Sequence, residues 1–257
     1  NTYWRLEPVF NIAAYDPNLF SISYQVVGYP ERFLLNNTDT PLVIIDWLDM
    51  PEDIFFVDIF AEDLAGNINN SITLTLYKDT VEPVIDIILP QSNDIYGDIA
   101  PSFKISVSED HLNTTWYILI GESPIISFTG FNGTIDTTTW DLIGNGTVTI
   151  RFHANDTAGN IEYKDITVRK NIFAPIITIN SPGNNDLFGI AAPNFIIYKS
   201  GQELNSTWYT LDNGITNITL TGTVLSGTIN QTVWDNFGLE IITLRFYIND
   251  SFGKIGF

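Results

Sequence analysis

The stretch Ala61-Glu62-Asp63-Leu64-Ala65-Gly66-Asn67 decides the fold, because the chain contains it three times. It returns as Ala154-Asn155-Asp156-Thr157-Ala158-Gly159-Asn160 and, with more substitutions, as Ile248-Asn249-Asp250-Ser251-Phe252-Gly253-Lys254. The offsets are 93 and 94 residues. A tryptophan stands sixteen residues before each motif aspartate: Trp47, Trp140 and Trp234. A fixed period of this length predicts tandem structural repeats.

The local pattern within each repeat is that of β-strands. Apolar and polar residues alternate in Ile72–Leu76, Phe103–Val107 and Val148–Phe152. Turn-forming clusters lie between such runs, for example at Gly130–Gly133 and Gly144–Gly146. No stretch shows a helical period with caps at both ends. We therefore predict an all-β chain of three tandem immunoglobulin-like antiparallel β-sandwich domains.

The predicted domains are repeat 1 (residues 1–79), repeat 2 (80–171) and repeat 3 (172–257). Their junctions are short and end in Pro83 and Pro175, which predicts stiff hinges and an extended rod. Repeat 1 starts at the equivalent of Asn93, so we expect it to lack the first strand, and we expect repeat 3 to lack the last. The sequence is then either a window from a longer array, or a chain completed by strand exchange with a neighbouring copy.

Composition excludes several classes of function. The 30 acidic and 11 basic residues give a net charge of −19, which argues against nucleic-acid partners. Cysteine is absent, so disulfides and thiolate metal sites are excluded. No uninterrupted apolar run reaches the ~18 residues of a membrane span. The only histidines are His111 and His153, and the sequence motifs of hydrolases and nucleotide-binding enzymes are missing. We do not expect an enzyme.

Asparagine points to the extracellular surface. With 25 Asn and 41 Ser plus Thr, chance would give roughly four Asn-x-Ser/Thr sequons. The chain has ten, which either arise incidentally in an Asn- and Thr-rich β protein or mark dense N-glycosylation, our preferred interpretation. Dense glycosylation without cysteine favours an archaeal cell surface. The candidate sites are Asn36, Asn69, Asn113, Asn132, Asn145, Asn155, Asn205, Asn217, Asn230 and Asn249.

Two further motifs carry a family resemblance. Thr115–Tyr117 with Gly133–Trp140 in repeat 2 matches Thr207–Tyr209 with Gly227–Trp234 in repeat 3. Together with the Ala-x-Asp-x-Ala-Gly-Asn stretch, they resemble the immunoglobulin-like repeats of prokaryotic, and particularly archaeal, surface proteins. Repeat 1 departs from the pattern, with Ser23 in place of the early tryptophan. The resemblance implies the fold and a surface location, and it says almost nothing of function.

The functional hypothesis is a self-associating structural protein of a filament, stalk or surface layer. The alternative is an adhesin or receptor ectodomain that binds a glycan or protein through loops of one repeat. In that case repeat 1, the most divergent repeat, is the candidate ligand-binding domain. Its candidate exposed aromatic residues are Tyr3, Trp4, Tyr29 and Phe33.

The repeated motifs have structural and functional interpretations. The Asp-x-x-Gly motif fits a hairpin turn capped by the aspartate. Its alternative is a calcium cage at the first junction, formed by Glu62, Asp63, Asp79 and Glu82. At the second junction, the residues that we match to the acidic ones of the first are Arg169 and Lys170. Their positive charges would repel such an ion. The repeated tryptophans fit core positions better than sugar-binding ones, and Trp116 and Trp208 resemble the buried strand tryptophan of immunoglobulin domains.

Overall fold

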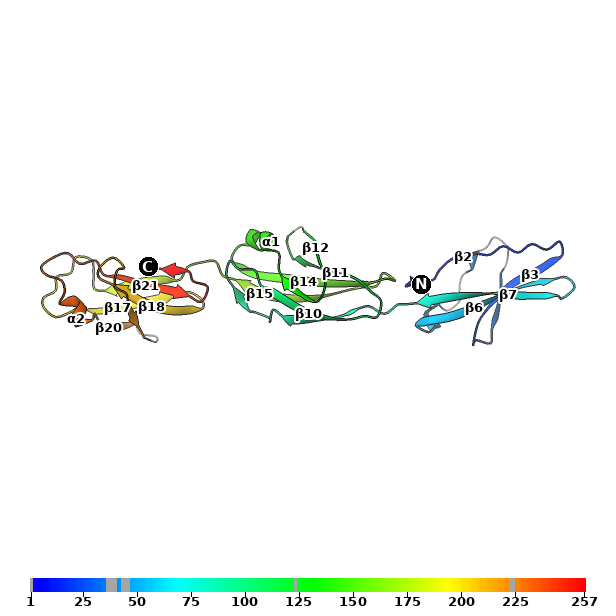
Figure 1. Cartoon of the computed structure of the whole chain (residues 1–257), viewed down its shortest axis with the longest axis horizontal. Coiled ribbons are helices and arrows are strands. Elements are labelled where there is room, and N and C mark those ends of the chain that lie inside the picture. The colour runs from blue at the N-terminus through cyan, green and yellow to red at the C-terminus, as the bar shows by residue number, and fades with distance from the viewer. Residues whose placement is uncertain (1, 36–40, 43–46, 123, 222–224) are drawn as a thin grey trace. The chain divides into compact units, whose positions relative to one another are not determined.

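The structure is a computed structural model that describes residues 2–35, 41–42, 47–122, 124–221 and 225–257 (Figure 1). In this part of the chain, each sheet consists of strands from one repeat. Repeat 1 contains β1 (Tyr3–Trp4), β2 (Phe10–Asn11), β3 (Leu19–Val26), β4 (Arg32–Leu35), β5 (Pro41–Leu42), a 3-10 helix (Trp47–Asp49), β6 (Asp53–Asp63) and β7 (Ile68–Lys78).

Repeats 2 and 3 share this element order apart from a strand added at their start, and repeat 3 has no equivalent of β1 among the described residues. Repeat 2 contains β8 (Val84–Leu89), β9 (Ile95–Tyr96), β10 (Ser102–Ser108), β11 (Leu112–Leu119), β12 (Ile126–Phe128), β13 (Asn132–Thr134), α1 (Thr137–Leu142), β14 (Gly146–Asp156) and β15 (Ile161–Lys170). Repeat 3 contains β16 (Ile176–Ser181), β17 (Asn194–Ser200), β18 (Leu204–Thr210), β19 (Ile218–Leu220), β20 (Ser226–Thr228), α2 (Gln231–Trp234), β21 (Arg245–Asp250) and β22 (Ile255–Gly256).

Repeat 2 shows the sheet topology in its fullest form. One sheet has the order β12-β11-β14-β15-β9 and the other β13-β10-β8. Repeat 1 matches it with β4-β3-β6-β7-β1 and β2-β5, and repeat 3 with β19-β18-β21-β22 and β16-β17-β20. The predicted sandwich architecture is confirmed, with one correction to the strand directions. β1 pairs with β7, and β9 with β15, in parallel.

The chain divides into two compact units that cut across the repeats. The first unit comprises Asn1–Leu89, Phe103–Gly133 and Ile150–Ile166, and the second comprises Pro90–Ser102, Thr134–Thr149 and Thr167–Phe257. Each unit therefore holds one repeat junction, residues 79–83 in the first and 171–175 in the second.

The cores follow the alternation read from the sequence. In β14 every second side chain from Val148 to Ala154 is buried, as period-2 patterning requires. Trp47 and Trp140 are 7% and 0% exposed, which confirms their predicted core positions. Trp234 is half-buried and packs against the core of repeat 3.

The prediction for Trp116 and Trp208 is wrong by one position. Both are only half-buried, and the next residue fills the core instead: Tyr117 is 1% and Tyr209 2% exposed. Successive residues of a strand face opposite sides of its sheet, so only one of each Trp-Tyr pair points inward. Trp116 stacks on His153 across the strand pair, with ring centroids 5.0 Å apart.

Short helices, which the sequence did not predict, follow a Gly-Thr-Ile motif that repeats 2 and 3 share (Gly133–Ile135 and Gly227–Ile229). Gly133 lies against the Phe103 ring, and a Cβ there would stand 2.8 Å from Phe103 Cζ. Ile135 is buried, and Asp136 accepts a hydrogen bond from Thr139 N (2.8 Å) to cap α1. In repeat 3, Gly227, Ile229, Asn230 and Val233 repeat each of these contacts.

Candidate functional site

The three Asp-x-x-Gly motifs form capped turns, as the turn interpretation predicts. Asp63 Oδ1 accepts hydrogen bonds from Ala65 N (2.9 Å) and Asn67 N (2.8 Å), and Asp63 Oδ2 accepts one from Asn67 Nδ2 (2.7 Å). These bonds, led by that from the Asn67 side chain, hold the pKa of Asp63 below its usual range. The turn glycines Gly66, Gly159 and Gly253 have φ of +83°, +93° and +82°, which glycine adopts without strain.

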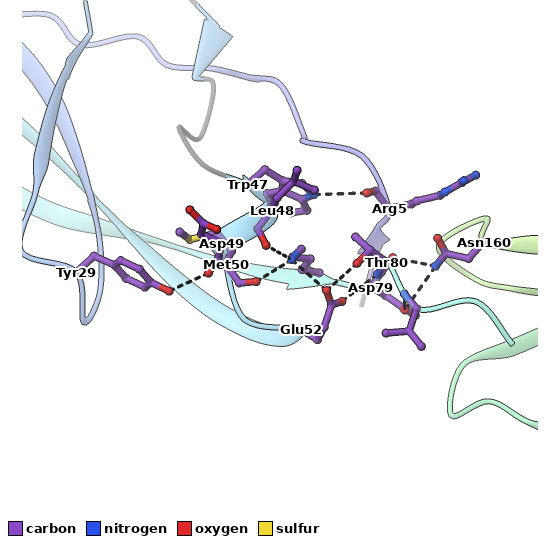
Figure 2. Close-up of polar contacts among 12 residues, drawn as sticks. Arg5, Tyr29, Trp47, Leu48, Asp49, Met50, Glu52, Asp79, Thr80 and Asn160 are labelled. Atoms are coloured by element: carbon purple, nitrogen blue, oxygen red, sulfur yellow. Dashed lines mark hydrogen bonds and ion pairs between the residues drawn. The ribbon is translucent and has the colours of Figure 1, made fainter. Parts of the chain in front are cut away.

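At the first junction, the turn of repeat 2 docks against Asp79, which follows β7. Asn160 Nδ2 donates to Asp79 O at 2.9 Å and to Asp156 Oδ2 at 2.6 Å (Figure 2 shows Asp79 and Asn160). Asp79 N donates to Trp4 O (3.1 Å), and Asp79 Oδ1 accepts from Val81 N (3.3 Å). These bonds fix the Asp79 backbone and leave its second carboxylate oxygen available for another partner.

That oxygen belongs to a cluster of three ionisable side chains. Asp79 Oδ2 lies 3.4 Å from His111 Nδ1, and one ligand atom each from Asp79, Glu109 and His111 lie within 4.8 Å of one another. His111 N donates to Glu109 Oε1 at 2.9 Å, and the Tyr3 ring lies 3.8 Å from the imidazole, centroid to centroid. Among the described residues, this is the group of three or more such side chains that is close enough to hold a metal ion.

The surroundings of Asp79 disfavour the charged form of its carboxylate. Asp79 is 6% exposed, and its Oδ2 accepts no hydrogen bond. Burial, and then the charges of Asp156 and Glu109, raise the pKa of Asp79 above its ordinary value. Asn160 Oδ1 is likewise buried without a hydrogen bond. The cluster therefore concentrates negative charge and unused oxygen atoms where burial makes both costly.

The predicted calcium cage does not form as a group of four. Glu62 pairs with Ile68 at the turn end of the β6–β7 hairpin, and Asp63 follows it into the turn. Lys78, directly before Asp79, pairs with Asp53 at the opposite end of that ladder. Eleven-residue strands at about 3.3 Å per residue separate the two ends by roughly 30 Å. Asp79 therefore cannot share an ion with Glu62 and Asp63, and Glu82 is exposed.

Sequence reasoning missed Glu109 and His111, although a usable signal was present. They lie in the β10–β11 connection, and His111 O accepts a hydrogen bond from Thr157 N in the motif turn. The motif turn of repeat 2 and the β10–β11 connection therefore lie at the same end of the sandwich, next to Asp79. A search at that end of the repeat would have gathered the three residues.

The structure shows that our alignment of the second junction with the first was wrong for Lys170. Lys170 matches Lys78, not Asp79: Lys170 Nζ donates to Trp140 O (2.6 Å) and Ile143 O (2.8 Å). Lys78 Nζ likewise donates to the carbonyls of Leu48 (3.2 Å) and Met50 (2.7 Å), which Figure 2 labels. The structural equivalent of Asp79 is Asn171, whose N donates to Tyr96 O as Asp79 N does to Trp4 O.

The aromatic residues of repeat 1 that we considered for ligand binding do not form one exposed surface. The Tyr3 ring contacts His111 in a tilted arrangement, while Trp4 and Phe33 are partly buried against the core. Tyr29 is 38% exposed, and its hydroxyl donates to Asp49 O at 3.2 Å. Trp4 is the positional counterpart of Tyr96 in repeat 2, because it pairs with Lys78 as Tyr96 pairs with Lys170.

Repeat 1 instead contains an open pocket of about 370 Å³, within the range typical of small-molecule sites. The pocket lies between the chain that follows β2 and the end of the β6–β7 hairpin. Its lining includes Ile12, Tyr15, Asp16, Glu62, Asp63 and Asn67. Because Asp63 and Asn67 already bond each other in the turn, their polar atoms are largely committed.

The described sequon asparagines all lie at or near the surface. Asn36 is outside the described residues. Exposed side chains are Asn69, Asn113, Asn132, Asn145, Asn205, Asn217 and Asn230, and half-buried ones are Asn155 and Asn249. In five of them the hydrogen bond to the backbone uses the side-chain oxygen: Asn69, Asn145, Asn155, Asn230 and Asn249.

Comparison with known proteins finds only distantly similar solved structures. No protein-family model and no curated relative matches the sequence. Similar solved structures include fibronectin(III)-like modules of Clostridium thermocellum CbhA, with 10% identity over 66% of this chain and 88% of theirs (TM-score 0.37). A 1.5-MDa bacterial ice-binding adhesin has 13% identity over 92% and 83% (TM-score 0.40). Chicken CNTN1 FN1–FN3 has 10% identity over 97% and 86% (TM-score 0.31).

These similarities are too distant to indicate what the chain binds or does. Within the described residues, the helices are all too short and insufficiently apolar to cross a membrane.

Proposed function

We propose that this chain is a non-enzymatic structural segment of an archaeal cell-surface filament, stalk or surface layer, N-glycosylated and in contact with further copies of itself. The observation that carries the proposal is the repetition of purely structural contacts. The capped turn and the tryptophan position recur in all three repeats, and the buried lysine recurs in repeats 1 and 2. A chain that reuses one sandwich in this way is suited to spanning distance.

The placement of the sequons supports the glycoprotein part of this proposal. A sugar is attached to the asparagine nitrogen, whereas the hydrogen bonds of Asn69, Asn145, Asn155, Asn230 and Asn249 to the backbone use the oxygen. Attachment of a glycan would therefore preserve these bonds. Such glycans would also cover apolar side chains on the strand surfaces.

Open sheet edges support contacts with further repeats. Repeat 2 has β8 beside β10, whereas β2, the equivalent of β10 in repeat 1, has β5 as its one strand partner among the described residues. In repeat 3 Leu187, the equivalent of Ile95 in β9, is 97% exposed. Unpaired edges accept a further strand, either from the same polypeptide or from another copy.

The test is mass spectrometry of glycopeptides from the native surface protein, combined with electron microscopy of the native assembly. The proposal requires glycans on several sequons and regular contacts between chains. Unmodified asparagines, together with a dispersed monomer that retains a ligand, would contradict it.

The pocket of repeat 1 favours a second candidate function, that of an adhesin or receptor ectodomain. Its discriminating experiment is a glycan-array measurement on the full chain and on a variant with Tyr15→Ala. Tyr15 is 95% exposed, so its truncation should leave the core intact. Binding that Tyr15→Ala abolishes would favour the adhesin.

A further inference from the structure

The first junction has a charge arrangement that the fold itself does not require. Asp79, Glu109 and His111 come from two segments that are distant in sequence: Asp79 directly follows β7, and Glu109 and His111 lie in the β10–β11 connection. Asp79 is more than nine-tenths buried, and its Oδ2 faces His111 Nδ1 without accepting a hydrogen bond. A cation bound beside this buried carboxylate would stabilise its charged form.

We propose that Asp79, Glu109 and His111 bind one divalent transition-metal ion of the zinc type at the junction of repeats 1 and 2. An imidazole nitrogen with two carboxylate oxygens is a ligand set typical of zinc and its neighbours, whereas calcium is bound by oxygen atoms alone. Ligands about 2.0–2.1 Å from a tetrahedral ion stand about 3.3 Å apart. The 3.4 Å between Asp79 Oδ2 and His111 Nδ1 matches that separation.

The surroundings hold the ligands in place. The Tyr3 ring contacts the His111 ring, and the backbone N of His111 donates to Glu109 Oε1, which holds that carboxylate beside His111. Asn160 ties the Asp79 backbone to the motif turn of repeat 2. Because Asp79 ends repeat 1 while Glu109 and His111 belong to repeat 2, the ion links the two across a hinge that the sequence leaves only a few residues long.

The second junction provides a control within the same chain. By the matched registers of β10 with β17 and of β11 with β18, Glu109 corresponds to Gly201 and His111 to Glu203. Asp79 corresponds to Asn171. Only one ionisable ligand remains there, so we expect one bound ion per chain and none at the second junction.

The test is a zinc titration of the full, metal-stripped chain by calorimetry, with cobalt absorption spectra as a readout of coordination. The variants are His111→Gln and Asp79→Asn, the latter placing the residue of the second junction at the first. The matched control is Glu203→Gln. We expect one equivalent of zinc for the unmodified chain and the control. His111→Gln and Asp79→Asn each remove a direct ligand. Loss of a residue that only hydrogen-bonds a ligand weakens metal binding about 10–100-fold, so we expect these variants to weaken zinc binding by at least that factor.

Three outcomes of the binding measurements would overturn the proposal: no bound zinc, binding that His111→Gln leaves unchanged, or calcium displacing zinc at equal concentration. The His111 side chain is 30% exposed, so His111→Gln is expected to fold even if Asp79→Asn does not. A circular-dichroism spectrum of each variant checks this. If His111 and Asp79 form only an ion pair, His111→Gln lowers the unfolding temperature equally with zinc and with chelator, which also overturns the proposal.

Discussion

Replacement of Gly133 by alanine tests whether the Gly-Thr-Ile motif is a packing requirement. The new Cβ would stand 2.8 Å from Phe103 Cζ and 2.9 Å from Cε1, closer than carbon atoms approach. The Phe103 ring cannot move away easily, because it is 3% exposed and packs against the rings of Tyr117, Phe128 and Phe152. The expected effect is therefore a strained core.

Overpacking of a filled core costs about 1–3 kcal/mol, while loss of glycine flexibility in the unfolded chain returns about 0.4–1 kcal/mol. We expect Gly133→Ala to lower the free energy of unfolding by about 1–2 kcal/mol. The matched control is Gly144→Ala, where no atom lies within 4 Å of the added Cβ. It should leave stability unchanged or raise it slightly.

Hydrogen exchange measured by mass spectrometry locates the effect within the three-repeat chain. Amides of β14 should exchange about 5–30-fold faster in Gly133→Ala than in the unmodified chain, and no faster in Gly144→Ala. Equal protection in both variants would show that Phe103 gives way without cost, and the packing explanation of the motif would then be wrong.

Three further predictions concern polar groups. Lys170→Met should lower the free energy of unfolding by about 2 kcal/mol in urea titrations, because it leaves the Trp140 and Ile143 carbonyls without their buried donor. Asp136→Ala should cost about 1 kcal/mol by removing the cap of α1, and an unchanged urea midpoint would contradict this. Hydrogen bonds led by that from the Thr210 hydroxyl lower the pKa of Asp212 from 3.8 to about 2, so the loop stability that they provide is present above pH 4 and lost as the pH falls towards 2. A carboxyl titration by NMR checks that pKa.

Much of the fold could be predicted because the same strand and turn patterns occur in more than one repeat. Alternation identified the strands β7, β10 and β14, and three occurrences of Asp-x-x-Gly identified the final hairpin. The short helices were missed because a helix of six residues has no full hydrophobic period, although Asp136 and Asn230 supply a cap in each case. The orientation of Trp116 was missed because alternation fixes that neighbours face opposite sides, not which neighbour faces the core.

The candidate site was predicted only in part. Asp79 was identified as a candidate ligand at the first junction. Its supposed partners Glu62 and Asp63 were chosen because they belong to the repeated motif that precedes this junction in the sequence. A hairpin of two eleven-residue strands separates them in space. The actual neighbours Glu109 and His111 come from about thirty residues further along the chain, and sequence spacing alone gives no measure of that approach.

Repetition itself separates structural residues from candidate functional ones in this chain. Lys78 and Lys170 occupy one position and make the same two kinds of hydrogen bond, so the sandwich explains both without any ligand. Asp79 departs from this rule, because Asn171 makes the same backbone bond without its charge. A carboxylate is therefore unnecessary for folding the junction, and at 6% exposure it is unfavourable there. A group that the fold neither needs nor favours is best explained by a ligand, which is why the ion is expected at the first junction alone.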